Sequence, residues 1–323
     1  MLKKAVSLTL RVVLVVGCLV YAFWGINFSE LGLAFTRFSV PAILVTTVVT
    51  LLGYWILGVR LNFLSGYRCG NWVGLKAFFL SMAVNNVAPA KLGEVAKAFY
   101  FRQESGFSLS QSLSMVFWER FFDLNAILAM GLAVAFHFRL KMAFFPLAIG
   151  VGVIWLCLFV VRVWPAKAER LIALIPFERA REFILEIKLQ LVHGVTLRYL
   201  VILAGYTALV WILYAVPTYM TVMWVARLNL TAVQTLAVFV ISSLGMAMPS
   251  SPGAVGVFEA AVIFGLGLFK VDKELALAIG LLIHMMQYIP TTVIGLLVLM
   301  KSGLSLKSFK RREAEMEGQL QHE

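Results

Sequence analysis

The chain has little charge for its length and few residues of the kinds that bind metals or form disulfides. Asp, Glu, Lys and Arg make up 14% of its 323 residues, whereas 61% are hydrophobic. A soluble domain does not need this much apolar surface, so the composition predicts an integral membrane protein. The three cysteines show no motif spacing and the four histidines are scattered. We therefore expect no disulfide, no metal and no cofactor.

Common catalytic motifs are also missing. The sequence has no P-loop, no Gly-x-Ser-x-Gly and no paired aspartates of the metal-dependent transferase type. We therefore expect a protein that is not an enzyme and does not hydrolyse ATP. The net charge of +12 comes from basic residues in the loops, as on the cytoplasmic side of membrane proteins. For that reason we expect no nucleic-acid partner.

Long apolar stretches dominate the chain, and a bilayer is crossed by about 20 such residues. Six stretches are long enough, at 5–25, 40–64, 110–136, 143–163, 199–226 and 274–300. The first has no clear cleavage site, so we interpret it as a retained helix and not as a signal peptide. Two shorter apolar pairs, 73–104 and 232–270, predict re-entrant hairpins or strongly kinked spans. The expected fold is all-α, a polytopic helical bundle in one domain, 1–304, with a polar cytoplasmic tail, 305–323.

Basic residues predict the orientation of the spans. Lys3 places the N-terminus in the cytoplasm, and Arg60, after the second span, and the polar stretch 164–198 fall on the same side. Both termini are then cytoplasmic in a multi-pass protein of the inner (plasma) membrane, although Arg139 falls outside and counts against this arrangement. Within the polar stretch, 177–193 has apolar residues at helical spacing and predicts an amphipathic helix, either at the membrane surface or as a plain connector.

Two apolar segments are interrupted by Pro and Gly, and each then resumes with a glutamate. The first break reads Asn85-Asn86-Val87-Ala88-Pro89-Ala90-Lys91-Leu92-Gly93-Glu94. The second reads Met248-Pro249-Ser250-Ser251-Pro252-Gly253-Ala254-Val255-Gly256-Val257-Phe258-Glu259. Irregular backbone at membrane depth survives only where it is buried in protein or lines a cavity. Broken helices in corresponding halves point to a transport site, so we expect these breaks to hold or move something inside the bilayer.

The two halves share one short sequence match. Arg60-Leu61-Asn62-Phe63 ends the second span, Arg227-Leu228-Asn229-Leu230 ends the fifth, and a broken segment follows each. These two spans run in opposite directions in the predicted topology, which would make the repeat inverted, as in many alternating-access transporters. Four-residue matches also arise by chance, so both interpretations stay open.

The span 110–136 contains three charged residues, Glu119, Arg120 and Asp123. Each unpaired charge at a helix centre costs roughly 2.5–3.5 kcal/mol on insertion scales. The three must therefore pair, lie near the cytoplasmic end or face a wet cavity. They either lock helices together as an ion-paired cluster or serve function, and we favour function because intramembrane charges are functional by default.

The residues around the first break could bind an anion. Lys91, Glu94 and Lys97 lie near one face of the resuming helix, whose N-terminus offers free N–H groups and a positive dipole. This arrangement is a candidate seat for a phosphate. Alternatively, the lysines simply lie at the level of the cytoplasmic headgroups.

The second break offers hydroxyls and close backbone approach through Ser250, Ser251, Gly253 and Gly256. We expect Glu259 either to pair with a basic group, such as Arg120 or a lysine of the first hairpin, or only to anchor the hairpin. His284, in the last span, is interpreted as a structural residue in preference to a proton relay.

Three motifs occur in order: the first break, Glu119-Arg120-Phe121-Phe122-Asp123, and Pro252-Gly253-Ala254-Val255-Gly256-Val257-Phe258-Glu259. Together they resemble the flippase-like family, the transmembrane region of lysylphosphatidylglycerol synthases, over nearly the whole chain. The last motif is usually close to Pro-Gly-Gly-x-Gly-x-x-Glu. Here Ala254 replaces the second Gly, and Lys91 stands where Arg is common. Neither change removes the break or the charge.

The resemblance implies an inner-membrane protein that translocates or helps handle lipids, of the phospholipid, polyprenyl-phosphate or hopanoid class. It also implies that the C-terminal aminoacyltransferase domain of the full synthases is lacking here, so lysyl transfer is not expected. The leading hypothesis is a lipid flippase whose partners are membrane lipids, with a homo-oligomer allowed. The residues expected to bind the lipid are Asn85, Asn86, Pro89, Lys91, Glu94, Lys97, Glu119, Arg120, Asp123, Ser250, Ser251, Pro252, Gly253, Gly256 and Glu259.

Two other functions were weighed against transport. One is a non-catalytic accessory subunit of an enzyme that modifies lipids or the cell envelope. The other is a membrane-embedded enzyme acting on a lipid phosphate, with Glu119 or Asp123 as base. The missing nucleophile and metal motifs argue against the second.

Overall fold

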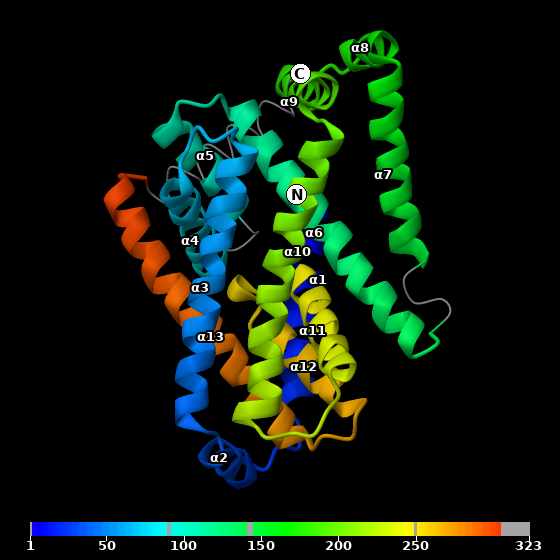
Figure 1. Ribbon diagram of the computed structural model, residues 1–323. Coiled ribbons are helices and arrows are strands. Elements are labelled where there is room, and N and C mark those ends of the chain that lie inside the picture. The colour runs from blue at the N-terminus through cyan, green and yellow to red at the C-terminus, as the bar shows by residue number, and fades with distance from the viewer. Residues whose placement is uncertain (1, 89–91, 141–144, 249–250, 305–323) are drawn as a thin grey trace.

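The computed structural model describes residues 2–88, 92–140, 145–248 and 251–304, and these contain helices and no β-strand (Figure 1). The predicted tail, 305–323, lies outside the described residues. The helices are α1 (Leu2–Phe23), α2 (Phe28–Thr36), α3 (Val40–Leu64), α4 (Asn71–Val87), α5 (Gly93–Ser105), α6 (Leu109–His137), α7 (Phe145–Val163), α8 (Pro165–Ala173), α9 (Glu178–Leu189), α10 (Leu197–Met220), α11 (Ala232–Ala247), α12 (Val257–Gly267) and α13 (Lys273–Ser302). Short π-helical turns, η2 (Gln190–Gly194) and η3 (Thr221–Val225), and a 3-10 turn, η4 (Pro252–Ala254), complete the bundle. The all-α prediction is confirmed.

Four helices in the described residues are long and apolar enough to cross a membrane alone: α3, α6, α10 with η3, and α13. Two further spans exist if each bent pair counts as one, since α1 and α2 meet at 77° and α7 and α8 at 108°. Local sequence explains the first bend, because Gly25 adopts a left-handed φ of 70° and the Asn27 side chain accepts hydrogen bonds from Ser29 and Glu30. The predicted stretches 5–25 and 143–163 therefore correspond to arms of bent pairs.

Each of the two broken segments folds as a helical hairpin. The first hairpin consists of α4 and α5, and the second of α11, η4 and α12; in each, the two arms pack against one another. A glycine allows close approach in both: a Cβ on Gly93 would lie 2.1 Å from the Ser81 carbonyl oxygen, and one on Gly245 would lie 2.8 Å from Ala261 Cβ. The chain therefore enters and leaves at the same end of the bundle, as the re-entrant interpretation requires.

The order of elements repeats in the two halves with opposite direction. Figure 1 shows α3 and α10 running in opposite senses, with the first hairpin entering from the end near α9 and the second from the end near α2. This is the arrangement of an inverted repeat. The short sequence match is not the cause, since Arg60 is buried inside α3 whereas Arg227 lies exposed in a turn after η3.

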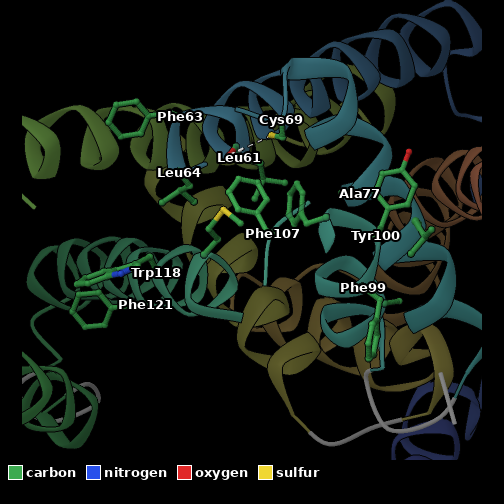
Figure 2. Close-up of a cluster of buried hydrophobic side chains, with 14 of the residues drawn as sticks. Leu61, Phe63, Leu64, Cys69, Ala77, Phe99, Tyr100, Phe107, Trp118 and Phe121 are labelled. Atoms are coloured by element: carbon green, nitrogen blue, oxygen red, sulfur yellow. Dashed lines mark hydrogen bonds between the residues drawn. The ribbon is translucent and has the colours of Figure 1, made fainter. Parts of the chain in front are cut away.

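An apolar core surrounds the first hairpin and the ends of α3 and α6. It includes Leu61, Leu80, Phe101 and Trp118, all of which are almost completely buried, and Figure 2 shows Leu61 and Trp118 among its labelled side chains. The three cysteines are free thiols, and Cys69 lies in this core. The core holds the first hairpin against the spans that carry the charged residues.

The amphipathic stretch forms α9, which lies with α8 across one end of the bundle (Figure 1). Directly after α9, Gln190 accepts a hydrogen bond from Trp118 Nε1 at 3.0 Å and donates one to Ser114 Oγ at 2.7 Å. Lys188 of α9 pairs with Glu169 of α8 at 2.6 Å. The predicted helix is therefore present and tied to α6.

We predict that Gly295→Ala destabilises the bundle, because a Cβ there would lie 2.0 Å from the Phe79 carbonyl oxygen of α4. Forcing α13 away from α4 is expected to cost about 1–3 kcal/mol, the range for overpacked sites. The free energy of unfolding in detergent–SDS mixtures measures it. Gly205→Ala is the matched control, since no atom lies within 4 Å of its added Cβ. Equal stability of the two variants would contradict the close crossing.

Candidate functional site

Six charged side chains from three helices gather into what we call the charge network: Arg60 of α3, Glu94 and Lys97 of α5, and Glu119, Arg120 and Asp123 of α6. Three are cations and three are carboxylates, so the network carries no net formal charge. Of the three possibilities for the charges in the span 110–136, the structure shows pairing, with partners from two other helices.

Glu119 is the centre of the charge network. Its Oε1 lies 3.0 Å from both Arg60 Nη2 and Arg120 Nη2, and its Oε2 lies 2.9 Å from Lys97 Nζ. The side chains of Glu119, Arg60 and Lys97 have no solvent exposure. A buried carboxylate is tolerated only when it is paired and hydrogen-bonded, and these three contacts meet that condition.

Arg60 joins α3 to α6 through a second carboxylate. Its Nη1 lies 2.6 Å from Asp123 Oδ1, and the same oxygen accepts a hydrogen bond from Trp211 Nε1 of α10 at 3.0 Å. The Thr207 hydroxyl, also on α10, lies 3.4 Å from Arg60 Nη1. The guanidinium group of Arg60 on α3 thus contacts side chains of both α6 and α10.

Sequence reasoning missed Arg60 as a site residue because it used this residue, near the end of the second span, only as a marker of orientation. The helix α3 has the predicted bounds, 40–64, and the Arg60 side chain is fully buried within it. The signal was present, since an arginine within a continuous apolar segment needs a buried carboxylate partner.

The charge network is open on one side. Exposure rises from Asp123, at 13%, to Glu94, at 26%, and Arg120, at 49%. Arg120 lies 3.0 Å from Glu119 and from Asp123, and 3.8 Å from Glu94. Each of these carboxylates also contacts Arg60 or Lys97, so none of them depends on Arg120 alone for a cationic partner.

Glu259 of the second hairpin takes a different partner from the one expected. Its Oε1 lies 2.6 Å from His284 Nδ1 of α13, and its Oε2 accepts a hydrogen bond from the Gly256 N–H at 2.7 Å. Arg120 and Lys97 pair with other carboxylates, so neither is the partner of Glu259, and Lys91 lies outside the described residues. Glu259 is the third residue of α12, so one carboxylate oxygen caps the start of its own helix while the other contacts His284.

The two breaks meet at α13, which passes between the hairpins. Tyr288 donates its hydroxyl proton to the Asn86 carbonyl at 3.1 Å, and the Asn86 amide donates to the Thr292 hydroxyl at 2.8 Å. On the other side, Tyr288 packs so closely on Gly253 that a Cβ there would lie 2.3 Å from the ring. Turn η4 also packs against α4. Side chains of α13 therefore contact both breaks, Asn86 by hydrogen bonds and Gly253 by ring packing.

The remaining predicted site residues lie at the hairpin tips. Asn85 accepts a hydrogen bond from the Gly93 N–H at 2.8 Å and so closes the first break, and Ser251 donates to the Val255 carbonyl at 2.8 Å. Pro252 starts η4, and Gly253 and Gly256 adopt positive φ values of 66° and 87°. Pro89, Lys91 and Ser250 lie outside the described residues. In the described part of the chain, no group of three or more His, Cys, Asp or Glu residues could hold a metal ion.

A lateral apolar groove of about 350 Å³ runs between α6, α10 and α11. It is lined by Met130, Ile212, Ala215, Val216, Tyr219, Ala232, Thr235 and Leu236. Two of the helices that line the groove, α6 and α10, also carry Asp123 and Trp211.

Comparison with known proteins agrees with this architecture. Residues 8–295 match the family described as "Lysylphosphatidylglycerol synthase TM region". A UPF0104 membrane protein of Methanocaldococcus jannaschii is 26% identical over 229 residues, which cover 66% of this chain and 92% of that protein. No solved structure matches the chain significantly. Because the family match spans both breaks and the whole charge network, this chain belongs to the lysylphosphatidylglycerol synthase transmembrane family.

Proposed function

We propose that this protein moves a lipid with an anionic headgroup across the bilayer. Arg120 is the observation that carries the proposal. It lies in a membrane-spanning helix, its side chain is half exposed, and each carboxylate it contacts has a second cation. A phosphate can therefore bind to Arg120 without leaving a buried carboxylate unpaired.

The two hairpins give such a headgroup a route. They enter from opposite ends of the bundle, and their breaks meet at Tyr288 of α13. Access from either side of the membrane then needs movement of one hairpin relative to α13, and not a rebuilding of the bundle. The irregular backbone at the breaks supplies polar groups at a depth where lipid offers none.

The chains of the lipid stay in an apolar environment. The lateral groove is lined by residues of α6, α10 and α11, and α6 also carries Arg120, so a chain can lie in the groove while its phosphate contacts Arg120. The protein need only lower the free energy of moving the headgroup. The chain belongs to a family named for a lipid synthase, and this supports a lipid substrate.

Leaflet exchange of labelled lipids in proteoliposomes tests this function. The wild type is expected to exchange phosphatidylglycerol or a polyprenyl phosphate faster than protein-free vesicles. Arg120→Ala is expected to lose about tenfold or more of that rate, because a charge-assisted hydrogen bond contributes about 1.5–3 kcal/mol. Its fold should survive, since Glu94, Glu119 and Asp123 keep Lys97 or Arg60 as partners.

Two further proteins complete the experiment. Arg120→Lys keeps the charge and is expected to keep part of the rate. Arg102→Ala removes an exposed arginine from the end of α5 and is expected to exchange lipid like the wild type. A wild type that exchanges no lipid, but copurifies with a lipid-modifying enzyme, would replace transport with an accessory role. A fast Arg120→Ala protein would show that the headgroup binds elsewhere.

A further inference from the structure

The contacts of His284 restrict where its protons are. Nε2 lies 2.9 Å from the Gly253 carbonyl oxygen, which can only accept, so Nε2 must carry a proton. Nδ1 lies 2.6 Å from Glu259 Oε1. One further proton must lie between these two atoms, because two acceptors at this distance repel each other.

The surroundings of Glu259 favour its ionised form. Oε2 accepts the Gly256 N–H, and the carboxylate lies at the N-terminus of α12, where the helix dipole stabilises negative charge. The shared proton is therefore placed on His284, as an imidazolium with both nitrogens donating. The ion pair is neutral as a whole and buried.

Loss of that proton breaks one of the two hydrogen bonds. A neutral imidazole has a single N–H, so it can donate to Glu259 or to Gly253 but not to both. The other nitrogen then faces an oxygen lone pair. Release of this proton to water converts the imidazolium to imidazole and removes one hydrogen bond between α13 and the second hairpin.

We propose that Glu259 and His284 form a binding site for one proton, which controls whether the second hairpin is held on α13. Gly253 packs on Tyr288, and Tyr288 donates to Asn86 of the first hairpin. A change at His284 is thereby transmitted to both breaks. As a coupling site for lipid movement, the inference rests on the proposed function; as a proton site, it rests on geometry alone.

No other described charge contacts the pair, whose neighbours include the rings of Phe258 and Tyr288. The elements packed on α12 and α13 carry few titratable groups, and α11 has none. On the neighbouring helices these groups are Lys3, Lys4, Arg11, Cys18 and Tyr21 of α1, Glu30 of α2, Tyr54 and Arg60 of α3 and Lys76 of α4; α13 itself also carries Lys273, Glu274, Tyr288 and Lys301. Arg60 is engaged in the charge network and Lys273 lies over the Tyr21 ring.

The proton site is tested without transport by ¹⁵N NMR of labelled histidine in the full-length protein, after His137, His193 and His322 are changed to Gln. His284 is expected to show two protonated nitrogens at low pH and one at high pH. Glu259→Gln should shrink the range of pH over which both nitrogens are protonated. A ring that holds the same number of protons throughout would overturn the proposal.

The coupling is tested by lipid exchange at the same pH values. The lipid-exchange rate of the wild type is expected to depend on pH. A single linked proton can change that rate by at most about tenfold per pH unit. His284→Gln keeps a donor and an acceptor but binds no proton, so its rate should be independent of pH; His137→Gln, at an exposed position, should behave like the wild type. Equal pH profiles of His284→Gln and the wild type would overturn coupling. If the wild type moves no lipid, the proposed function fails and the NMR result alone decides the proton site.

Discussion

Replacing Glu119 with alanine is expected to lower the free energy of unfolding by about 3–5 kcal/mol, the cost of breaking a buried ion pair by removing one partner. Glu119 contacts all three cations of the charge network, at 2.9–3.0 Å. Without it, Lys97 keeps only Glu94, and both arginines share Asp123. The network would then hold an excess positive charge in an apolar setting.

Unfolding in detergent–SDS mixtures measures this change. Glu104→Ala is the matched control, because that glutamate is exposed near the end of α5. The double variant Glu119→Gln with Lys97→Met restores charge balance and is expected to lose less stability than the two single changes added together. If Glu119→Ala were as stable as Glu104→Ala, the network would contribute nothing to the fold.

Arg60→Met is expected to have the second largest effect, also about 3–5 kcal/mol, for the same reason. Its guanidinium binds Glu119 with one nitrogen and Asp123 with the other, and so connects α3 with α6. Arg60→Lys should fall between Met and the wild type, since an ammonium group cannot reproduce the planar fork that reaches both carboxylates.

The same SDS titration distinguishes these variants. Arg37→Met removes an exposed arginine just after α2 and should change the stability little. Adding Asp123→Asn to Arg60→Met removes the carboxylate that Arg60 held most closely, at 2.6 Å, and is expected to recover part of the loss. If Arg60→Met were as stable as Arg37→Met in this titration, α3 and α6 would be held together by apolar packing alone.

The fold could be predicted where its causes are local. Long apolar segments specify membrane helices, and the Pro and Gly residues near 88–92 and 248–256 specify where two of them break. The charges Glu119, Arg120 and Asp123 had to find partners, because unpaired charges are too costly at membrane depth. The sequence predicts 5–25 and 143–163 as full spans but not the bends, and the structure continues each of them into a second arm at an angle.

Partners distant in sequence could not be predicted. The sequence left open whether Glu259 pairs with Arg120 or a lysine of the first hairpin, or only anchors its own hairpin. In the structure the start of its own helix and His284 occupy both oxygens. The sequence predicts the bounds of the second span, 40–64, and the structure confirms them. Whether Arg60, near the end of that span, faces water or two carboxylates depends on how α3 packs against α6, which no local pattern contains.

The sequence by itself determined a helical membrane protein with two interrupted helices and a small set of ionisable residues that needed partners, because hydropathy and backbone restrictions act over a few neighbouring residues. Only the tertiary structure decided which partners meet. Arg60 reaches Glu119 and Asp123 across 59 and 63 residues of chain, and Tyr288 reaches Asn86 across 202. Such pairs depend on which helix faces pack together, and packing is a property of the whole bundle that no local pattern contains.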